Sequence, residues 1–141
     1  DLRKRAMARK VIAAMGGEVE GKRIAMLGLT FKPNTDDMRD APAIVIAQGL
    51  IDAGAEVIAY DPEGMEAATS LMPGVTMASG TYQALDAADG AVIVTEWDVF
   101  RALDLPRVLK TMNGNTLVDL RNIYKPEQMK AAGFHYVSVG R

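Results

Sequence analysis

Short apolar runs alternate with helical patterns along the whole chain. Six runs have the continuous apolar character of strands that are buried on both faces of a parallel sheet. We therefore expect strands at residues 24–29, 56–60, 75–77, 91–95, 116–120 and 134–139. Apolar spacing and helix-starting residues predict helices at residues 2–15, 44–51, 63–71, 81–88, 98–102, 105–112 and 126–132. This alternation predicts an α/β fold: a Rossmann-like, doubly wound, mostly parallel six-stranded sheet with helices on both faces.

The predicted topology brings distant parts of the chain together. Right-handed crossovers place the first and fourth strands side by side, at the point where the strand order reverses. Ligands of such sheets bind at the carboxyl ends of the strands near this point. The loops after the first, fourth and fifth strands should therefore form one site.

The loop after the first strand, residues 28–42, has the strongest chemical character. The chain turns abruptly polar after Gly28, and Pro42 is well placed to open the next helix. Backbone N–H groups and the positive helix end favour an anion there, and Lys32 adds a full charge. The loop lacks the Gly-x-Gly-x-x-Gly pattern of dinucleotide loops, so side chains should meet a phosphate as much as backbone does.

Individual side chains of this loop allow two interpretations each. Phe31 covers a ligand or anchors the loop in the core, and Lys32 contacts an anion or only solvent. Arg39 reaches toward a ligand or pairs with a neighbouring aspartate at position 36, 37 or 40. The adjacent carboxylates of positions 36 and 37 are weak support for a metal site without further ligands, and we expect none.

The other two loops offer an arginine and a tryptophan. Arg121 follows the fifth strand and carries a planar fork suited to phosphate, unless it only pairs with Asp119. After the fourth strand, Trp97 roofs the sheet or stacks on a base, and Glu96 reads as structural. Asp61 stands where dinucleotide folds place a ribose-binding acid, but the residues that follow it favour a turn.

Composition excludes several classes of protein. The 141 residues are enough for one domain. The net charge of −2 provides no electrostatic attraction to nucleic acid or to a membrane surface. No apolar run approaches a membrane span, and no signal peptide is apparent, so we expect a cytoplasmic protein. The absence of cysteine excludes disulfides, thiolate metal sites and a cysteine nucleophile. The sequence begins at Asp1, without an initiator Met, and we expect a fragment.

The loop also carries a long motif, Gly-x-x-Phe-Lys-x-x-Thr-Asp-Asp-x-Arg-x-(small)-Pro, at residues 28–42. In this motif the chain closely resembles the carboxyl-terminal, nucleotide-sugar-binding domain of the UDP-glucose/GDP-mannose dehydrogenase family. The resemblance extends over residues 1–141, and Thr95-Glu96-Trp97 followed by Phe100 is similar to the UDP-glucose branch. It implies that residues 1–17 are the tail of the helix connecting the family's two halves. Residues 18–141 would be the UDP-sugar-binding domain.

The resemblance also assigns roles to four side chains. Phe31, Lys32 and Arg121 match substrate-binding positions, and Arg39 matches an arginine that reaches the NAD held by the other half. Leu120 stands where relatives have glycine. The family's catalytic cysteine and NAD-binding domain match no residues here, so no catalytic residue is expected in this chain, which alone should be inactive.

The partners implied by the resemblance are UDP-glucose or UDP, the amino-terminal NAD-binding domain, and a second copy in a homodimer. Two alternatives stay open at this point. The chain could be a stand-alone Rossmann-like nucleotide-binding regulatory module, or the same domain from a dehydrogenase of another nucleotide sugar.

Overall fold

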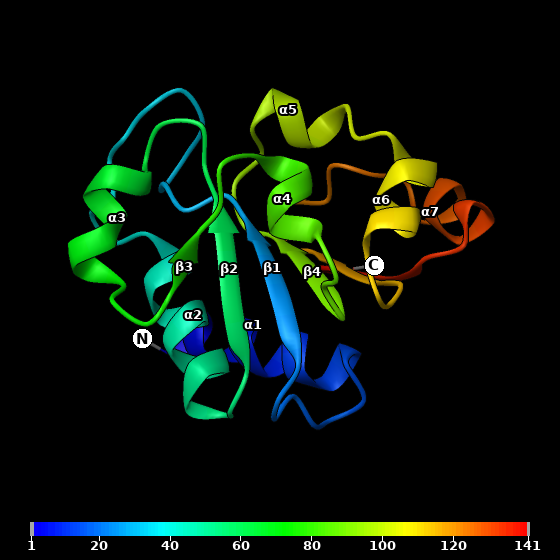
Figure 1. The fold of residues 1–141 in the computed structure, drawn as a ribbon, viewed down its shortest axis with the longest axis horizontal. Helices are drawn as coiled ribbons and strands as arrows, with labels where there is room; N and C mark the ends of the chain where they lie inside the picture. Colours follow the sequence, from blue (N-terminus) through cyan, green and yellow to red (C-terminus); the bar gives the residue numbers. More distant parts are fainter. Residues whose placement is uncertain (1, 141) are drawn as a thin grey trace.

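The computed structural model of the protein describes residues 2–140. Its strands are β1 (Arg23–Leu27), β2 (Glu56–Tyr60), β3 (Thr76–Met77), β4 (Gly90–Ile93), β5 (Thr116–Asp119) and β6 (His135–Ser138). Its helices are α1 (Leu2–Ala14), α2 (Pro42–Asp52), α3 (Met65–Leu71), α4 (Thr81–Leu85), α5 (Asp98–Arg101), α6 (Leu105–Thr111) and α7 (Pro126–Ala132). Each predicted element is present, and the ends differ by a few residues (Figure 1).

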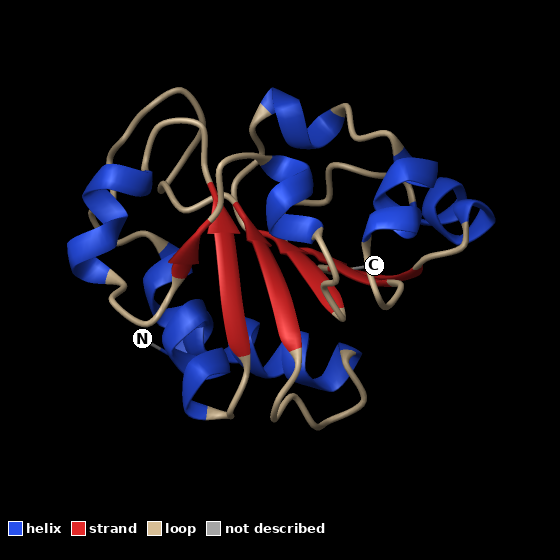
Figure 2. Cartoon of the chain, in the orientation of Figure 1, coloured by secondary structure: helices blue, strands red, loops and turns tan. Residues whose placement is uncertain are grey.

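The sheet has the predicted doubly wound order. Its six strands run β3-β2-β1-β4-β5-β6, and every pair is parallel. Strands β1 and β4 are neighbours, with Leu27 opposite Ile93, so the strand order reverses between them. Because all strands point the same way, their carboxyl ends lie along one edge of the sheet (Figure 2).

The two faces of the sheet bury separate apolar layers. On β1, Ile24 and Met26 face the layer under α1 and α2, whereas Ala25 and Leu27 face the opposite layer. Helices α4, α6 and α7 cover that second face, where Phe100 is fully buried. The period of two along a strand that is apolar on both sides produces this three-layer arrangement.

Close packing of α1 on α2 depends on a small residue. A Cβ atom built on Gly49 would lie 2.8 Å from the Cβ atom of Ala8, which is shorter than carbon atoms tolerate. A larger side chain at position 49 would therefore push the two helices apart. The amphipathic pattern predicted for residues 2–15 has its apolar side in this contact, through Val11.

Asp89 joins the amino ends of three strands by hydrogen bonds, at the edge of the sheet that we call the amino edge. Its Oδ2 accepts a hydrogen bond from the backbone N–H of Arg23 at 2.8 Å, and its Oδ1 accepts one from Nδ2 of Asn113 at 2.8 Å. These bonds favour the ionised form and lower the pKa of Asp89, the backbone bond being the larger cause. The first, fourth and fifth strands thus share an anchor at the edge opposite the predicted site.

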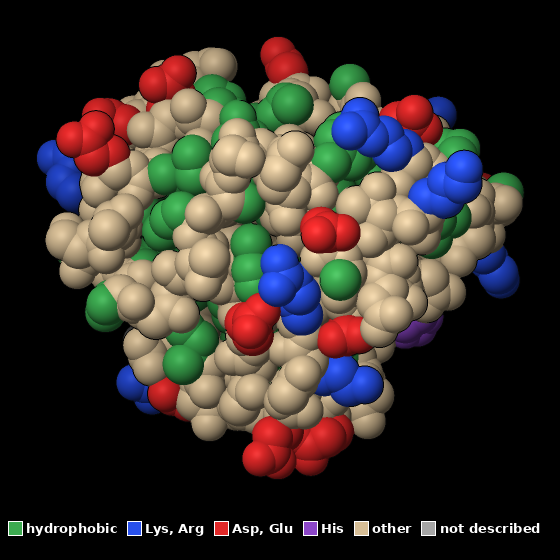
Figure 3. All heavy atoms as spheres, in the orientation of Figure 1, with side chains coloured by type: hydrophobic (Ala, Val, Ile, Leu, Met, Phe, Trp, Pro, Cys, Tyr) green, Lys and Arg blue, Asp and Glu red, His purple; other side chains and the backbone are tan. Residues whose placement is uncertain are grey.

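The helices of residues 2–140 are all too short or too polar to cross a membrane. On the face seen in Figure 3, Lys and Arg side chains are interspersed with Asp and Glu side chains, and no extended basic patch forms.

Candidate functional site

The loops after β1 and β4 are tied together at the carboxyl edge of the sheet. Gly28 ends β1 with φ of 99°, and a Cβ atom there would lie 2.6 Å from the Cβ and backbone N of Thr95. The predicted strand 24–29 therefore stops at Leu27, because the chain turns at a position that only glycine fits. The hydroxyl of Thr95 donates a hydrogen bond of 2.7 Å to the carbonyl of Thr30 across the junction.

Asp61 connects this junction to the end of β2. The residue is fully buried, and its Oδ2 accepts hydrogen bonds from the backbone N–H groups of Leu29 at 2.7 Å and Thr30 at 3.1 Å. Its Oδ1 accepts two more, from the backbone N–H groups of Glu63 at 2.9 Å and Gly64 at 2.8 Å. The predicted turn role is thus correct but incomplete, because the same carboxylate also fixes the start of the loop after β1.

Trp97 completes the connection. Its indole Nε1 donates a hydrogen bond of 3.0 Å to Oδ2 of Asp61, and only 7% of the residue is exposed. A ring buried in this way packs as a roof over the sheet, and the alternative of base stacking is not supported. One carboxylate therefore links the loops after β1, β2 and β4.

Phe31 and Lys32 stand outside this network. Phe31 is 51% exposed, so it is not a core anchor, and its backbone N–H closes the loop onto the carbonyl of Asp37 at 3.0 Å. The side chain of Lys32 is exposed, and its positive charge adds to the hydrogen bonds of Arg39 in lowering the pKa of the Asp37 carboxyl. An exposed aromatic ring next to an exposed ammonium group is suited to receive an anionic ligand.

Arg121 lies on the same edge of the sheet as Lys32. It follows β5, which is separated from β1 only by β4, a spacing of roughly 10 Å between the two strands. Its Nε donates a hydrogen bond of 2.8 Å to Oε2 of Glu96, and its Nη2 donates a second to the same oxygen. The alternative of an ion pair with Asp119 is therefore wrong for the guanidinium, which pairs with Glu96 instead.

Asp119 is committed to the backbone of its own loop. Its carboxylate accepts hydrogen bonds from the backbone N–H groups of Arg121 at 3.1 Å, Ile123 at 2.9 Å and Tyr124 at 3.1 Å. The hydroxyl of Tyr136 donates a further bond of 2.6 Å. With all these donors around it, the carboxylate fixes the loop and leaves the guanidinium of Arg121 to the neighbouring loop.

Arg39 is bound by one of the predicted aspartates. Its Nε and Nη2 donate hydrogen bonds of 3.0 Å each to the two carboxylate oxygens of Asp37, in a bidentate pair. This pairing lowers the pKa of the Asp37 carboxyl to about 2. The Arg39 side chain is nevertheless 90% exposed, so it projects from the surface of the chain.

A polar cleft of about 390 Å³ lies beside the loop after β1. Its lining residues are Asn34, Thr35, Asp36, Glu63 and Trp97. Within residues 2–140, no three His, Cys, Asp or Glu side chains come together in a way that could hold a metal ion. Two of the five lining residues, Asp36 and Glu63, are acidic, so the cleft itself does not supply the positive charge that an anion needs.

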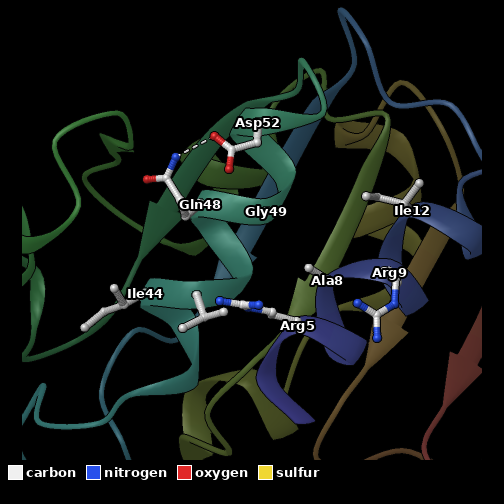
Figure 4. A pocket seen from close by; sticks show the side chains of 9 residues that line it. Arg5, Ala8, Arg9, Ile12, Ile44, Gln48, Gly49 and Asp52 are labelled. Carbon is white, nitrogen blue, oxygen red and sulfur yellow. Dashed lines mark hydrogen bonds between the residues drawn. The ribbon is translucent and has the colours of Figure 1, made fainter. Parts of the chain in front are cut away.

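A larger hollow of about 580 Å³ lies elsewhere, between α1 and α2. Figure 4 shows Arg5 of α1 extending toward α2, which contributes Ile44 and Gln48 to the lining, while Arg9 lies farther along α1, beyond Ala8. None of its lining residues belongs to the loops at the carboxyl edge. We therefore separate this hollow from the candidate site despite its greater size.

Comparison with known protein families identifies the family of this chain. Residues 25–126 match the model described as "UDP-glucose/GDP-mannose dehydrogenase family, UDP binding domain". The chain belongs to this family. Over all 141 of its residues it is 59% identical to UDP-glucose 6-dehydrogenase of Rhizobium meliloti (strain 1021). It is 39% identical over 133 residues to UDP-glucose 6-dehydrogenase TuaD of Bacillus subtilis (strain 168). The chain spans 32% and 29% of the lengths of these two family members.

Solved structures of the family have the same fold. A UDP-glucose dehydrogenase from Pyrobaculum islandicum is similar with a TM-score of 0.76 and 29% identity, over 96% of this chain and 29% of that one. An NDP-N-acetyl-D-galactosaminuronic acid dehydrogenase from Methanosarcina mazei Go1 has a TM-score of 0.84 and 26% identity, over 97% of this chain and 29% of that one. The predicted fold class and family are both confirmed.

Two residues of the site were underestimated from the sequence. Asp61 and Glu96 each look like polar residues at the end of a strand, and the sequence does not indicate which loop each will contact. The signal that could have found them is positional, since both follow apolar strands that end at the same edge as Lys32 and Arg121.

Proposed function

We propose that this chain is the UDP-sugar-binding part of an NAD-dependent UDP-glucose 6-dehydrogenase, which oxidises UDP-glucose to UDP-glucuronate in two steps. The observation that carries the proposal is the 59% identity to a UDP-glucose 6-dehydrogenase over the full chain, combined with the match to the family's UDP binding domain. The chemistry of the carboxyl edge agrees, because it offers two cations and an exposed aromatic ring near the strand-order reversal.

In this proposal Lys32 and Arg121 bind the diphosphate from two sides, and Phe31 packs against the nucleotide sugar. The cations suit the ligand because an ammonium group is a compact charge and a guanidinium group is a planar fork. Two charge-assisted contacts also give orientation, so the sugar is held at a fixed angle for the rest of the enzyme. None of these residues acts on the reacting carbon.

The remainder of the proposal concerns the parent enzyme. NAD, when bound, accepts hydride from the sugar, and Arg39 is the residue of this chain that we expect to reach it. Its 90% exposure and its position on a loop away from the core support such a role. We further propose that residues 1–17 are the tail of a connecting helix and 18–141 the binding domain. The amino-terminal NAD-binding domain and a second copy in a homodimer would be the partners, in the cytoplasm.

The binding site is tested by titrating UDP into the purified chain in a calorimeter. The double variant Lys32→Ala plus Arg121→Ala should lose roughly 100-fold in affinity, since it removes two charge-assisted contacts. The matched control is Lys110→Ala plus Lys130→Ala, which removes two exposed charges from α6 and α7 near the amino edge. No UDP binding by the unmodified chain, or equal loss in both double variants, would contradict the site.

Enzyme activity gives a second test. The chain contains no cysteine to form the thiohemiacetal and thioester intermediates, so it should produce no NADH from UDP-glucose and NAD. Measurable turnover would show that the chemistry proceeds without the missing half. A stand-alone regulatory module would also bind nucleotide, and the reading frame upstream of residue 1 separates it from a dehydrogenase. Competition with GDP-mannose and other UDP-sugars tests the choice of sugar nucleotide.

A further inference from the structure

The guanidinium of Arg121 is already oriented by a carboxylate in the structure. Both Nε and Nη2 donate to the same oxygen of Glu96, the Nε bond being 2.8 Å long. This uses the side edge of the guanidinium. Nη1 and the second hydrogen of Nη2 have no partner within residues 2–140, so the end of the fork is available to a ligand.

The two residues of this pair come from loops that are fixed independently of each other. The backbone N–H of Arg121 is held by Asp119, and the side chain of Asn122 makes two hydrogen bonds with the backbone of Val139, at 2.8 and 2.9 Å. Glu96 lies between Thr95 and Trp97, which are both buried and both hydrogen-bonded. The carboxylate therefore has a defined position from which to hold the arginine.

Without this contact Arg121 would be a long side chain with many accessible rotamers. Its side chain is 41% exposed, whereas that of Glu96 is only 20% exposed, so the glutamate is the more restrained partner. Restraining an arginine in advance removes part of the entropy that a ligand must otherwise overcome on binding. The net attraction of such a partly exposed ion pair is small, so its main effect is on orientation.

We propose that Glu96 is a positioning residue for the diphosphate of the nucleotide: it holds the side edge of Arg121 so that the end of the fork faces the ligand. This inference rests on the proposed function, because it assumes that Arg121 binds the diphosphate. In the opposite role, the carboxylate would compete with the ligand for the guanidinium. The two roles predict opposite changes in affinity when Glu96 is removed.

The experiment compares UDP binding by the unmodified chain with that of Arg121→Ala and three further variants, using calorimetry. Glu96→Ala should weaken binding roughly tenfold, because the freed arginine side chain must then be immobilised by the ligand. A tenfold change in affinity corresponds to about 1.4 kcal/mol of binding free energy. Glu96→Gln keeps an acceptor oxygen and should restore most of the affinity. Asp98→Ala, in the same segment, removes an equal charge from an exposed carboxylate whose distance to Arg101 is 4.0 Å, and should leave the affinity unchanged.

A spectroscopic measurement follows the positioning directly. The Nε–H resonance of Arg121 can be assigned from its loss in Arg121→Ala. NMR relaxation of this resonance should show that the N–H bond is restrained in the unmodified chain and in Glu96→Gln. In Glu96→Ala the same vector should become mobile while the thermal unfolding midpoint stays within experimental error. A general loss of structure would instead lower the midpoint and change many resonances, and that result would overturn the positioning role.

The remaining outcomes are also decisive. Tighter binding by Glu96→Ala identifies a competitor, and equal binding shows that the contact has no influence; either result overturns the inference while leaving the UDP site intact. Tighter binding by both Glu96→Ala and Asp98→Ala assigns the effect to charge alone and overturns it as well. If the unmodified chain binds UDP but Arg121→Ala binds equally well, the proposed role of Arg121 fails, and the inference fails with it.

Discussion

Replacing Asp61 by Asn should destabilise the fold more than any other replacement of a carboxylate by its amide near the site. The carboxylate of Asp61 is fully buried and accepts hydrogen bonds from four backbone N–H groups and one indole N–H, at 2.7 to 3.1 Å. The substitution preserves shape and volume almost completely. It changes one acceptor oxygen into an NH₂ group and removes the negative charge that strengthens every bond to it.

The magnitude follows from the donors that lose their partner. If the remaining oxygen stays with Leu29, Thr30 and Trp97, the new NH₂ group faces the N–H groups of Glu63 and Gly64, and donors face donors. Each buried donor left unpaired costs about 1–3 kcal/mol, and the remaining bonds lose their charge assistance. We therefore expect a loss of about 4 kcal/mol in the free energy of unfolding. This is a large part of the 5–15 kcal/mol that is typical of a domain.

The assay is equilibrium unfolding in urea, followed by circular dichroism, with Asp98→Asn as the matched control. That control changes an exposed carboxylate, and its effect should stay within about 0.5 kcal/mol. The chain has a single tryptophan, so its one indole N–H resonance in a proton NMR spectrum reports directly on the bond from Trp97 to Asp61. A loss below about 1 kcal/mol, or an unmoved indole resonance, would refute the reasoning that this carboxylate joins the three loops.

Three further predictions concern other parts of the molecule. Gly28→Ala should destabilise the chain by about 2–4 kcal/mol in urea unfolding, because it combines a φ of 99° with a contact of 2.6 Å to Thr95, and an effect under 1 kcal/mol would contradict this. The lowered pKa of Asp89 adds stability that is fully present above the unfolded pKa of about 3.9 and is lost as the pH falls through the folded pKa. Stability measured from pH 6 down to pH 2 should therefore fall less steeply in Asp89→Asn than in the unmodified chain, and parallel curves would contradict the assignment. Gly49→Val should lower the thermal midpoint by forcing α2 away from Ala8 of α1, whereas an unchanged midpoint would show that α1 is not firmly docked on α2.

The fold could be predicted because its pattern is redundant. Six apolar runs, each separated by a helical segment, leave few topologies once crossovers are right-handed, and the observed strand order is the leading one. Element ends were less predictable, because they are decided by single contacts across the sheet. The run that starts at Ile24 continues in apolar residues to Leu29, yet β1 ends at Leu27, since Gly28 turns the chain toward Thr95.

The edge of the sheet on which the candidate residues lie could be predicted from the sequence, whereas their hydrogen-bond partners could not. Topology alone brings Lys32 and Arg121 to one edge of the sheet, since the two strands preceding them run in the same direction. The partner of Arg121 depends on whether Glu96, from the loop after β4, lies closer to the guanidinium than Asp119, which is two residues away in the sequence. Asp119 is surrounded by N–H groups of its own loop, and this commitment leaves the guanidinium to Glu96.

The pairings matter because they explain how a long loop without the glycine fingerprint can still hold a defined shape. Dinucleotide loops achieve this with backbone that approaches the phosphates closely. Here, two buried carboxylates, Asp61 and Asp119, bind the backbone N–H groups at the strand ends and thereby occupy donors that would otherwise face an anion. In the proposed function, the positive groups that bind the diphosphate are the side chains of Lys32 and Arg121. We therefore expect the affinity for the nucleotide to fall strongly when those two side chains are removed and only weakly when the loop backbone is changed. A glycine-rich phosphate loop would show the reverse.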